Sequence, residues 1–444
     1  MLEKRIYFIG INGIGMSGLA KIMKTKGYDV IGADLSRTSV TEELESIGIT
    51  IYAEHDIKNL KNVDLVIVSS AIKEGNPEYM YALENKIKVL KRGEYLAELL
   101  NLSTGIAVAG THGKTTTSSM LGTTMLTLDP TIVVGGILPE IASNARCGTS
   151  EFFIAEADES DNSFLYMNPE YSIITNIEAD HLENHGSLEK IEKSFIQFME
   201  QTQKEIIVCN DCKNIRRIIK NRKNIKTYSL HDETSDIYAK NIEIKNGITH
   251  FDVLIQGEFQ GNFSLGIPGD HNINNALPVI YLSKKFGVSL EEIQKKLLNF
   301  KGAKRRYDIL YDEKCKVIDD YAHHPTEIKA TIQGALTIET KPIVAIFQPH
   351  RYSRINFLIE EFKDIFQGVE KVILLPIYSA GEKNIYNITL ETLKEKINHN
   401  NTVILENNEL LDGEIEFENE EKIYLFMGAG DISKIAHKIV IEKK

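Results

Sequence analysis

The sequence has few cysteines and no long apolar run. Its four Cys form only one CxxC pair, Cys209 and Cys212, without the second pair that a zinc site of this kind needs, so we interpret all four as reduced thiols. No apolar stretch approaches the length that spans a bilayer, and no signal-type segment precedes the first predicted strand at Arg5. We therefore expect a cytoplasmic protein that does not insert into membranes.

Basic residues are also in short supply. The chain carries 51 Lys and Arg against 63 Asp and Glu, a formal net charge of −12, which argues against a general nucleic-acid surface. Anionic substrates must then be held by local groups of cations. A convincing Ser-His-Asp set is missing as well, which directs attention away from a covalent nucleophile.

The length predicts several domains. At 444 residues the chain is too long for one ordinary core, and a length prior gives about three domains. Alternating strand and helix patterns predict an α/β protein, with an antiparallel hairpin at 248–263 and a helix at 290–299. We place a Rossmann-like domain at 1–100, a central P-loop domain with a mostly parallel sheet at 101–302, and a second Rossmann-like domain at 303–444.

The most informative stretch is residues 110–117, Gly-Thr-His-Gly-Lys-Thr-Thr-Thr, which follows an apolar run and opens a helical pattern. Such a strand, loop and helix aim backbone N–H groups and a helix N-terminus at a phosphate. In a P-loop of this kind Lys114 supplies positive charge, and the Thr115 hydroxyl is placed to hold Mg²⁺. The strict motif requires Gly where Val108 stands, so a glycine-rich turn from strand to helix with a surface Lys is the alternative.

A second glycine-rich turn lies near the N-terminus. Gly13, Gly15 and Gly18 match G-x-G-x-x-G, and the following predicted strand ends at Asp34. Taken alone, this fingerprint suggests NAD, with the pyrophosphate on the helix N-terminus and a ribose hydroxyl on the Asp34 carboxylate. The pattern indicates a diphosphate nucleotide without naming it, and close packing of helix on strand is the structural alternative.

Polar residues follow other predicted strands. Ser69 and Ser70 end a strand beside the expected switch point of the first sheet, and residues 156–161 form an acidic run after a central strand. So many neighbouring carboxylates repel one another unless a cation neutralises them, and Mg²⁺ prefers oxygen ligands. A solvated acidic loop is the alternative. His181 follows the next strand, where it is either structural or a third anchor beside Glu156 for a metal or an acyl phosphate.

The third domain has strands that end in His and Arg. Residues 319–327 and 348–354 each follow an apolar run, and together they predict a cationic edge able to bind a carboxylate. A basic hinge at 300–308 precedes them. Asn272, at the start of a predicted helix, is either a cap or a contact to a nucleotide base.

Six segments together resemble the Mur ligases: GINGIGMSGLA from Gly10, GTHGKTTT from Gly110, AEADESDNSF from Ala155, TNIEADHL from Thr175, DDYAHHPTEI from Asp319 and FQPHRYSR from Phe347. The resemblance runs in unbroken order from near residue 5 to near residue 437. Within the family, the member that attaches the first amino acid of the peptidoglycan stem is the most similar. The member that attaches a ready-made tripeptide is the alternative.

The resemblance implies an ATP-dependent ligase of peptidoglycan precursor synthesis. It would add L-alanine to the carboxylate of UDP-N-acetylmuramate through an acyl phosphate, with ATP and Mg²⁺ as cofactors, as a monomer or weak homodimer. Uridine diphosphate then replaces NAD in the first domain. Two other classes stay open: an NAD-dependent oxidoreductase, which leaves the phosphate loop unused, and a P-loop NTPase switch, which does not explain the cationic third domain.

Carried over residue by residue, the resemblance and the fingerprints assign five sets. The predicted catalytic residues are Lys114, His181, Glu156 and, as the base for the amine proton, His323. The predicted ATP ligands are Gly110, Thr111, His112, Gly113, Lys114, Thr115, Thr116, Asn272, Arg305, Arg306 and Asp320. The predicted ligands of the uridine diphosphate sugar are Gly13, Ile14, Gly15, Met16, Ser17, Asp34, Ser69 and Ser70. The amino acid is assigned to Tyr321, His323, Arg351 and Arg354, and the metal to Thr115, Glu156 and His181.

Overall fold

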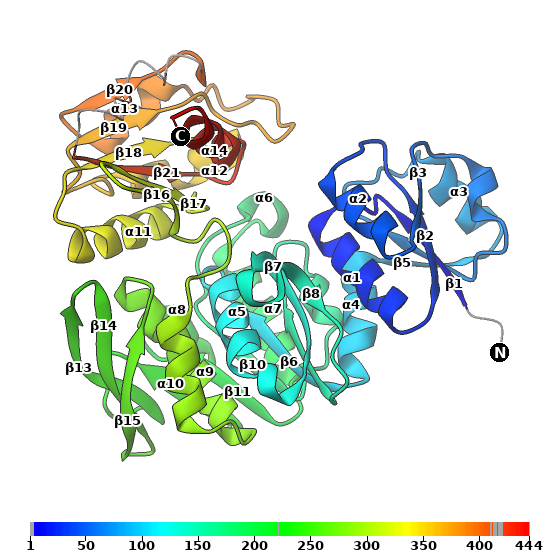
Figure 1. Ribbon diagram of the computed structural model, residues 1–444, viewed down its shortest axis with the longest axis horizontal. Coiled ribbons are helices and arrows are strands. Elements are labelled where there is room, and N and C mark those ends of the chain that lie inside the picture. Colours follow the sequence, from blue (N-terminus) through cyan, green and yellow to red (C-terminus); the bar gives the residue numbers. More distant parts are fainter. Residues whose placement is uncertain (1–3, 221, 409–410, 412–414, 416–420, 444) are drawn as a thin grey trace. The chain divides into compact units, whose positions relative to one another are not determined.

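A computed structural model describes residues 4–220, 222–408, 411, 415 and 421–443 (Figure 1). Residues 1–3, which precede the first predicted strand, lie outside these ranges. The chain forms two compact units. Unit 1 comprises the residues up to Ile177 together with Glu192–Lys226, and unit 2 comprises Glu178–Ile191 together with the residues from Thr227 onward.

Unit 1 begins with a five-stranded parallel sheet in the order β3-β2-β1-β4-β5. Its strands are β1 (Arg5–Ile9), β2 (Asp29–Ala33), β3 (Thr50–Tyr52), β4 (Leu65–Val68) and β5 (Lys88–Lys91). Its helices are α1 (Ile14–Thr25), α2 (Ser39–Ser46), the 3-10 helix η1 (Ile57–Leu60), α3 (Pro77–Glu84) and α4 (Arg92–Asn101). The strand order reverses between β1 and β4, which places the loops after these two strands at a ligand-binding crevice.

The second sheet of unit 1 has the order β12-β11-β10-β6-β9-β7-β8. Its strands are β6 (Thr104–Ala109), β7 (Thr131–Leu138), β8 (Ser143–Arg146), β9 (Phe152–Glu156), β10 (Tyr171–Ile174), β11 (Glu205–Cys209) and β12 (Ile225–Ser229), which ends in unit 2. The helical elements are α5 (Lys114–Thr124), η2 (Leu126–Leu128), η3 (Pro139–Ile141), η4 (Ser163–Tyr166), α7 (Leu188–Gln201) and α8 (Lys213–Ile218). Strand β6 pairs in parallel with β9 and β10, and its residues 106–109 are fully buried, as expected for a strand covered on both faces.

Unit 2 contains an antiparallel set of strands and a six-stranded sheet. Strands β13 (Ile237–Lys245), β14 (Ile248–Ile255) and β15 (Glu258–Leu265) form two consecutive hairpins, which confirms the hairpin predicted at 248–263. Both turns use two residues of positive φ, Asn246 and Gly247 in the first and Gln256 and Gly257 in the second, as short hairpins require. Helices α9 (Asp270–Lys285) and α10 (Leu290–Asn299) follow.

The six-stranded sheet has the order β16-β17-β21-β18-β19-β20, in which only β16 is antiparallel. Its strands are β16 (Asp308–Asp312), β17 (Lys316–Asp320), β18 (Ile343–Phe347), β19 (Lys371–Leu374), β20 (Thr402–Ile404) and β21 (Ile423–Met427). The helical elements of this part are α6 (Leu182–His185), α11 (Pro325–Ile338), α12 (Tyr352–Leu358), η5 (Ile359–Phe362), α13 (Leu390–Ile397) and α14 (Ile432–Lys443). Along β21, Leu425 packs in one apolar cluster and Phe426 in another, so successive side chains bury on opposite faces.

These sheets agree with the predicted α/β class, while the domain boundaries at 100 and 302 stay predictions. Within the described ranges, we find no helix long and apolar enough to cross a membrane.

Candidate active site

The loop after β6 is held tightly against the end of β10. Gly110 and Gly113 have φ values of 136° and 81°, and a Cβ on Gly110 would lie 2.1 Å from the Thr175 hydroxyl oxygen. The Thr175 hydroxyl donates to the His112 carbonyl at 2.5 Å, while the Asn176 amide accepts from the His112 N–H at 2.8 Å. The loop therefore has a fixed conformation ahead of the N-terminus of α5.

Lys114 begins α5, and its ammonium group is largely enclosed. Its Nζ donates to the carbonyls of Gly110 at 2.6 Å and Thr111 at 3.2 Å, and to a carboxylate oxygen of Glu159 at 2.8 Å. Burial alone would lower the pKa of Lys114, but the negative charges of Glu159 and Asp158 outweigh burial and raise this pKa above its usual value. The loop therefore holds a permanent positive charge.

The carboxylate of Glu156, at the end of β9, accepts hydrogen bonds from three donors. It accepts hydrogen bonds from the Thr115 hydroxyl at 3.2 Å, the Ser118 hydroxyl at 3.0 Å and the Gly135 N–H at 2.6 Å. A Cβ on Gly135 would lie 2.8 Å from a Glu156 carboxylate oxygen. The predicted metal ligands Thr115 and Glu156 are thus in contact, and this hydroxyl and carboxylate pair fits the oxygen ligands that Mg²⁺ prefers.

A cavity of about 350 Å³ in unit 1 joins the two glycine-rich turns. The glycine turn of the first sheet and the phosphate loop both contribute to its wall, which consists of Gly13, Ile14, Gly15, Met16, Ser69, Ser70, Arg92, Leu96, Lys114, Val133, Val134, Gly135, Glu156 and Asp158. Predicted sugar-nucleotide ligands therefore share one cavity with Lys114 and Glu156.

Two predicted ligands of the first sheet do not line this cavity. The Ser17 hydroxyl donates to the Ile14 carbonyl at 3.1 Å within α1. The Asp34 carboxylate accepts the N–H groups of Asn12 at 3.0 Å and Ser36 at 3.2 Å. Asp34 thus shapes the glycine turn in this structure, and its ribose contact stays a prediction.

The hairpin of β7 and β8, which the sequence analysis did not identify, supports the glycine turn. The Asn144 amide donates to the Ile14 carbonyl at 2.8 Å. A Cβ on Gly18 would lie 2.8 Å from the Cβ of Ala145, so the third glycine of the fingerprint allows α1 to approach β8. The hairpin also supplies the cavity residues Val133, Val134 and Gly135.

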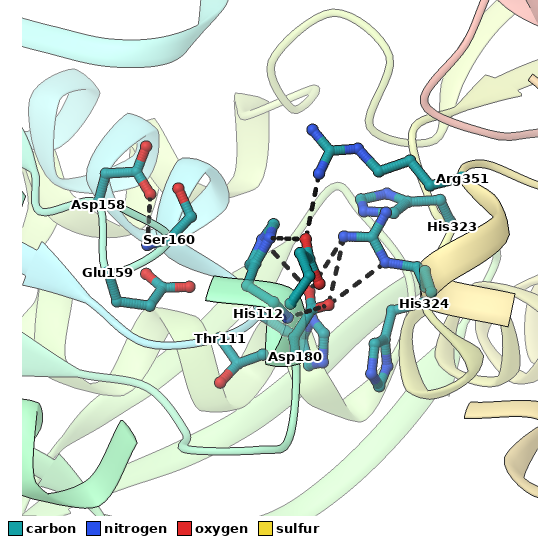
Figure 2. A network of polar contacts seen from close by, with 12 residues as sticks. Thr111, His112, Asp158, Glu159, Ser160, Asp180, His323, His324 and Arg351 are labelled. Atoms are coloured by element: carbon teal, nitrogen blue, oxygen red, sulfur yellow. Dashed lines mark hydrogen bonds and ion pairs between the residues drawn. The ribbon is translucent and has the colours of Figure 1, made fainter. Parts of the chain in front are cut away.

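In unit 2, two arginines of the β18–α12 region contact the segment around α6. Arg354 pairs with Asp180 at 3.3 Å, and Arg351 pairs with Glu183 at 3.1 Å. Figure 2 labels Asp180 and Arg351. His181 lies between these carboxylates, 3.6 Å from Asp180 and 3.5 Å from Glu183. His181 belongs to unit 2, whereas Thr115 and Glu156 belong to unit 1, so a shared metal site stays a prediction.

The remaining predicted residues of the third domain gather at the carboxyl ends of β17 and β18. The guanidinium groups of Arg305 and Arg306 lie 4.8 and 5.1 Å from the centre of the Tyr321 ring. The Tyr321 ring is 5.2 Å from that of His323, which is 5.8 Å from that of His350. The structure thus brings Tyr321 and His323 together with Arg305 and Arg306.

Three predicted ATP ligands have partners of their own. Arg305 donates to the Gly428 carbonyl at 2.8 Å. The Asn272 amide donates to the Pro268 carbonyl at 2.6 Å, as a residue that fixes a helix start does. The buried Asp320 carboxylate accepts two backbone N–H groups, and burial raises its pKa to about 6.

Comparisons with known proteins place this geometry in a family. Three family models match the chain: the Mur ligase family catalytic domain at residues 5–104, the Mur ligase middle domain at residues 108–283, and the Mur ligase glutamate ligase domain at residues 305–430. A UDP-N-acetylmuramate--L-alanine ligase of Fusobacterium nucleatum subsp. nucleatum is 60% identical, over 99% of this chain and 97% of its own length. The chain belongs to the Mur ligase family.

Solved structures agree with this assignment. The UDP-N-acetylmuramate-alanine ligase of Thermotoga maritima is 30% identical, has a TM-score of 0.82 and covers 99% of both chains. A murein peptide ligase of Psychrobacter arcticus, 24% identical with a TM-score of 0.71 over 99% of this chain and 98% of its own, shares the fold. The predicted family and the three-domain α/β fold are confirmed.

Several residues that border the site in this Mur ligase were missed by sequence reasoning. Arg92, Gly135 and Asp158 line the cavity, and the Asp158 carboxylate accepts the N–H of Ser160 at 3.0 Å (Figure 2). Tyr378 stacks on His350 with ring centres 5.5 Å apart. Asp158 and Ser160 stood inside the quoted acidic segment, whereas Arg92, Gly135 and Tyr378 carried no motif signal at all.

Two histidines of this Mur ligase, His323 and His350, are neutral in the folded state near pH 7. Burial, reinforced by the positive charge of Arg354, lowers the pKa of His323 to about 3 and that of His350 to about 4. A base works best when its pKa is near the operating pH. The conformation described here therefore does not favour His323 as the base for the amine proton, and that role stays a prediction.

We expect the stability of the folded Mur ligase to fall as the pH drops from 7 to 5. An unfolded His323 binds a proton below a pKa of about 6.5, whereas the folded one does so only near pH 3, so protons favour the unfolded chain between these values. Urea midpoints at both pH values measure the loss. His323→Gln should reduce this loss of unfolding free energy by about 2 kcal/mol. His231→Gln, at an exposed histidine, is the matched control. Equal losses in both variants would contradict the lowered pKa of His323.

Proposed function

We propose that this Mur ligase joins L-alanine to the carboxylate of UDP-N-acetylmuramate, with ATP converted to ADP through an acyl phosphate. The observation that carries the proposal is the single cavity in which the glycine turn of the first sheet meets Lys114 and Glu156. Relatives of this chain that are 60% and 40% identical bear the name of that reaction. ATP, Mg²⁺ and a cytoplasmic location belong to the proposal, as does a monomer or weak homodimer.

The first half-reaction needs charge neutralisation more than it needs a covalent nucleophile. Transfer of the γ-phosphoryl group to a carboxylate brings two anions together, so cations and aligned N–H groups are the main requirement. Lys114 supplies the fixed charge, and the N-terminus of α5 supplies N–H groups for the phosphates. Thr115 and Glu156 would hold Mg²⁺, which when bound neutralises phosphate charge further.

The second half-reaction needs an amine that is unprotonated and held in place. The cationic edge of the third domain, with Arg351 partly exposed, can bind the carboxylate of an amino acid. Tyr321 and the neutral imidazole of His323 form an uncharged wall beside it. These features support a small zwitterion as the second substrate.

The proposal predicts that ADP appears only when UDP-N-acetylmuramate and L-alanine are both present. A coupled ADP assay with each substrate omitted in turn measures this dependence. ADP formation without these two substrates would point to a P-loop NTPase switch. Binding of NADH would instead point to an oxidoreductase. Replacing alanine by the stem tripeptide distinguishes the alanine-adding ligase from the tripeptide-adding ligase. Turnover with the tripeptide but not with alanine would assign the recycling reaction.

A further inference from the structure

Asn176, which follows β10, makes three hydrogen bonds to the phosphate loop and was not among the predicted site residues. Its side-chain amide accepts the N–H of His112 at 2.8 Å and donates to the carbonyl of the same residue at 3.0 Å. Its backbone carbonyl accepts the N–H of Thr111 at 3.1 Å. Figure 2 labels both of these loop residues. Asn176 therefore pairs with two consecutive residues of the loop much as a neighbouring strand would.

These hydrogen bonds determine which N–H groups of the loop can face a phosphate. The N–H groups of Thr111 and His112 are directed at Asn176, so those that remain for a phosphate are at the start of α5, where a helix offers its N–H groups no intrahelical acceptor. Their direction follows from the conformation of the loop, because α5 begins at Lys114, directly after it. Loss of the Asn176 side chain would therefore displace these N–H groups and Lys114 together.

The next residue, Ile177, is fully buried and is anchored by the segment that follows β11. Its N–H donates to Sγ of Cys212 at 3.5 Å, and its carbonyl accepts the Cys212 thiol at 3.8 Å. The same carbonyl accepts the amide of the buried Asn214 at 2.7 Å. Cys212 caps α8, and Asn214 lies in its first turn. Both backbone polar groups of Ile177 are thus paired by side chains at the start of one helix.

Ile177 is also the last residue of unit 1 before the chain enters unit 2 at Glu178. Any displacement of the segment that begins there would pass along the backbone to Asn176 and from Asn176 to the phosphate loop. The hydrogen bonds from the start of α8 fix the backbone between these two places. The second cysteine of the CxxC pair, Cys212, therefore has a defined contact in the structure, although the sequence shows no metal motif around it.

We propose that Asn176 is a positioning residue for the phosphates of ATP, and that Cys212 and Asn214 keep it in place by anchoring Ile177. The inference rests on the proposed function, because it takes ATP as the ligand of the loop. Asn176 acts through the conformation of the loop, and the two residues of the α8 segment act through the backbone of Ile177.

The variant Asn176→Ala tests the first part of the proposal. It should raise the KM for ATP about tenfold or more and change the KM for L-alanine less than about threefold, because only the phosphate loop loses its support. Asn101→Ala is the matched control, since the Asn101 amide also bridges two backbone groups of unit 1, the Asn168 N–H and the Tyr166 carbonyl. The control should change either KM less than about twofold.

The link through Ile177 is tested at the start of α8. Asn214→Ala should raise the KM for ATP about threefold or more, and this effect should be smaller in the Asn176→Ala background, because both side chains act on the same loop. Cys212→Ala should behave like Asn214→Ala. Cys212→Ser should behave like the wild type, since a hydroxyl can accept the Ile177 N–H and donate to its carbonyl as the thiol does.

Two further measurements on the full chain do not depend on turnover. Hydrogen exchange of the backbone amides of residues 111–113 should be faster than in the wild type in both Asn176→Ala and Asn214→Ala, and unchanged in Asn101→Ala. Calorimetric titration with MgADP should show an affinity about tenfold or more lower in Asn176→Ala. Fast exchange of the loop in Asn176→Ala with a wild-type affinity for MgADP would overturn the proposed role of Asn176.

The failure of each part can be recognised separately. Wild-type exchange of the loop in Asn214→Ala and Cys212→Ala would overturn the link to α8. A wild-type chain without alanine-dependent ADP formation would reject the proposed function, while the exchange data and the MgADP titration would still decide whether Asn176 positions the loop.

Discussion

Lys114→Ala is expected to lower the rate of ADP formation by about 10³-fold or more. Lys114 is the buried cation at the start of α5, where the phosphates of ATP are expected, and no other Lys or Arg side chain is placed in the loop. Without this charge, the phosphoryl group would have to move between two anions that lack the cation held in the phosphate loop. Single-turnover ADP formation with all substrates present measures the loss.

The same substitution also affects folding, because Glu159 is almost fully buried and pairs with Lys114 at 2.8 Å. Leaving a buried carboxylate without its partner costs about 3–5 kcal/mol, so inactivity alone could reflect unfolding. The double variant Lys114→Ala with Glu159→Gln removes both charges and should recover much of the stability without recovering activity. Lys204→Ala, at an exposed ion pair, is the control. A folded double variant with more than about one tenth of wild-type activity would contradict the role of Lys114.

Glu78→Ala is expected to destabilise the first sheet by about 3–5 kcal/mol. The Glu78 side chain is fully buried in unit 1. Its carboxylate accepts hydrogen bonds from the Tyr7 hydroxyl, the Asn59 amide and the Asp56 N–H, and lies 2.7 Å from Nδ1 of His55. Truncation leaves the buried Tyr7 hydroxyl without this acceptor and removes one acceptor from the part-buried donors of His55, Asp56 and Asn59.

Hydrogen exchange at the amides of β1 measures this change within the first sheet, because Tyr7 lies on that strand. A loss of about 3–5 kcal/mol corresponds to exchange that is roughly 150- to 5,000-fold faster. Glu78→Gln keeps the shape and one acceptor oxygen, and should lie between the wild type and the alanine variant. The exposed Glu84→Ala on the same helix is the control, and equal effects in both alanine variants would show that the buried network is not what stabilises the sheet.

Patterns within a short stretch of sequence were predictable. The helix expected at 290–299 is α10, which Ser289 caps through its hydroxyl and which buries Ile293 and Leu297 one turn apart. The contact of Thr115 with Glu156 also follows from sequence, because strands that flank a phosphate loop end at the same edge of a parallel sheet. In both cases the residue types and their spacing along the chain were enough to make the prediction.

Partners that come from distant parts of the chain were not predictable. Asp34 and Arg305 were predicted to contact ligands. In the structure, the Asp34 carboxylate accepts a backbone N–H of the glycine turn, and the Arg305 guanidinium donates to the Gly428 carbonyl. Nothing local in the sequence marks Arg92 as a cavity residue, or indicates that Gly135 donates its N–H to Glu156. Such contacts depend on how the hairpin and the sheets pack, which hydrophobic period alone does not encode.

The contribution of Gly135 to the cavity wall limits how resistance to an inhibitor could arise. A compound that fills this space would touch the main chain at Gly135 and the side chains of Lys114 and Glu156. Even a methyl group at Gly135 would collide with Glu156, since its Cβ would lie 2.8 Å from the carboxylate. Escape by substitution at these three positions would therefore disturb the proposed catalytic groups themselves, which makes this part of the wall a durable target for an inhibitor.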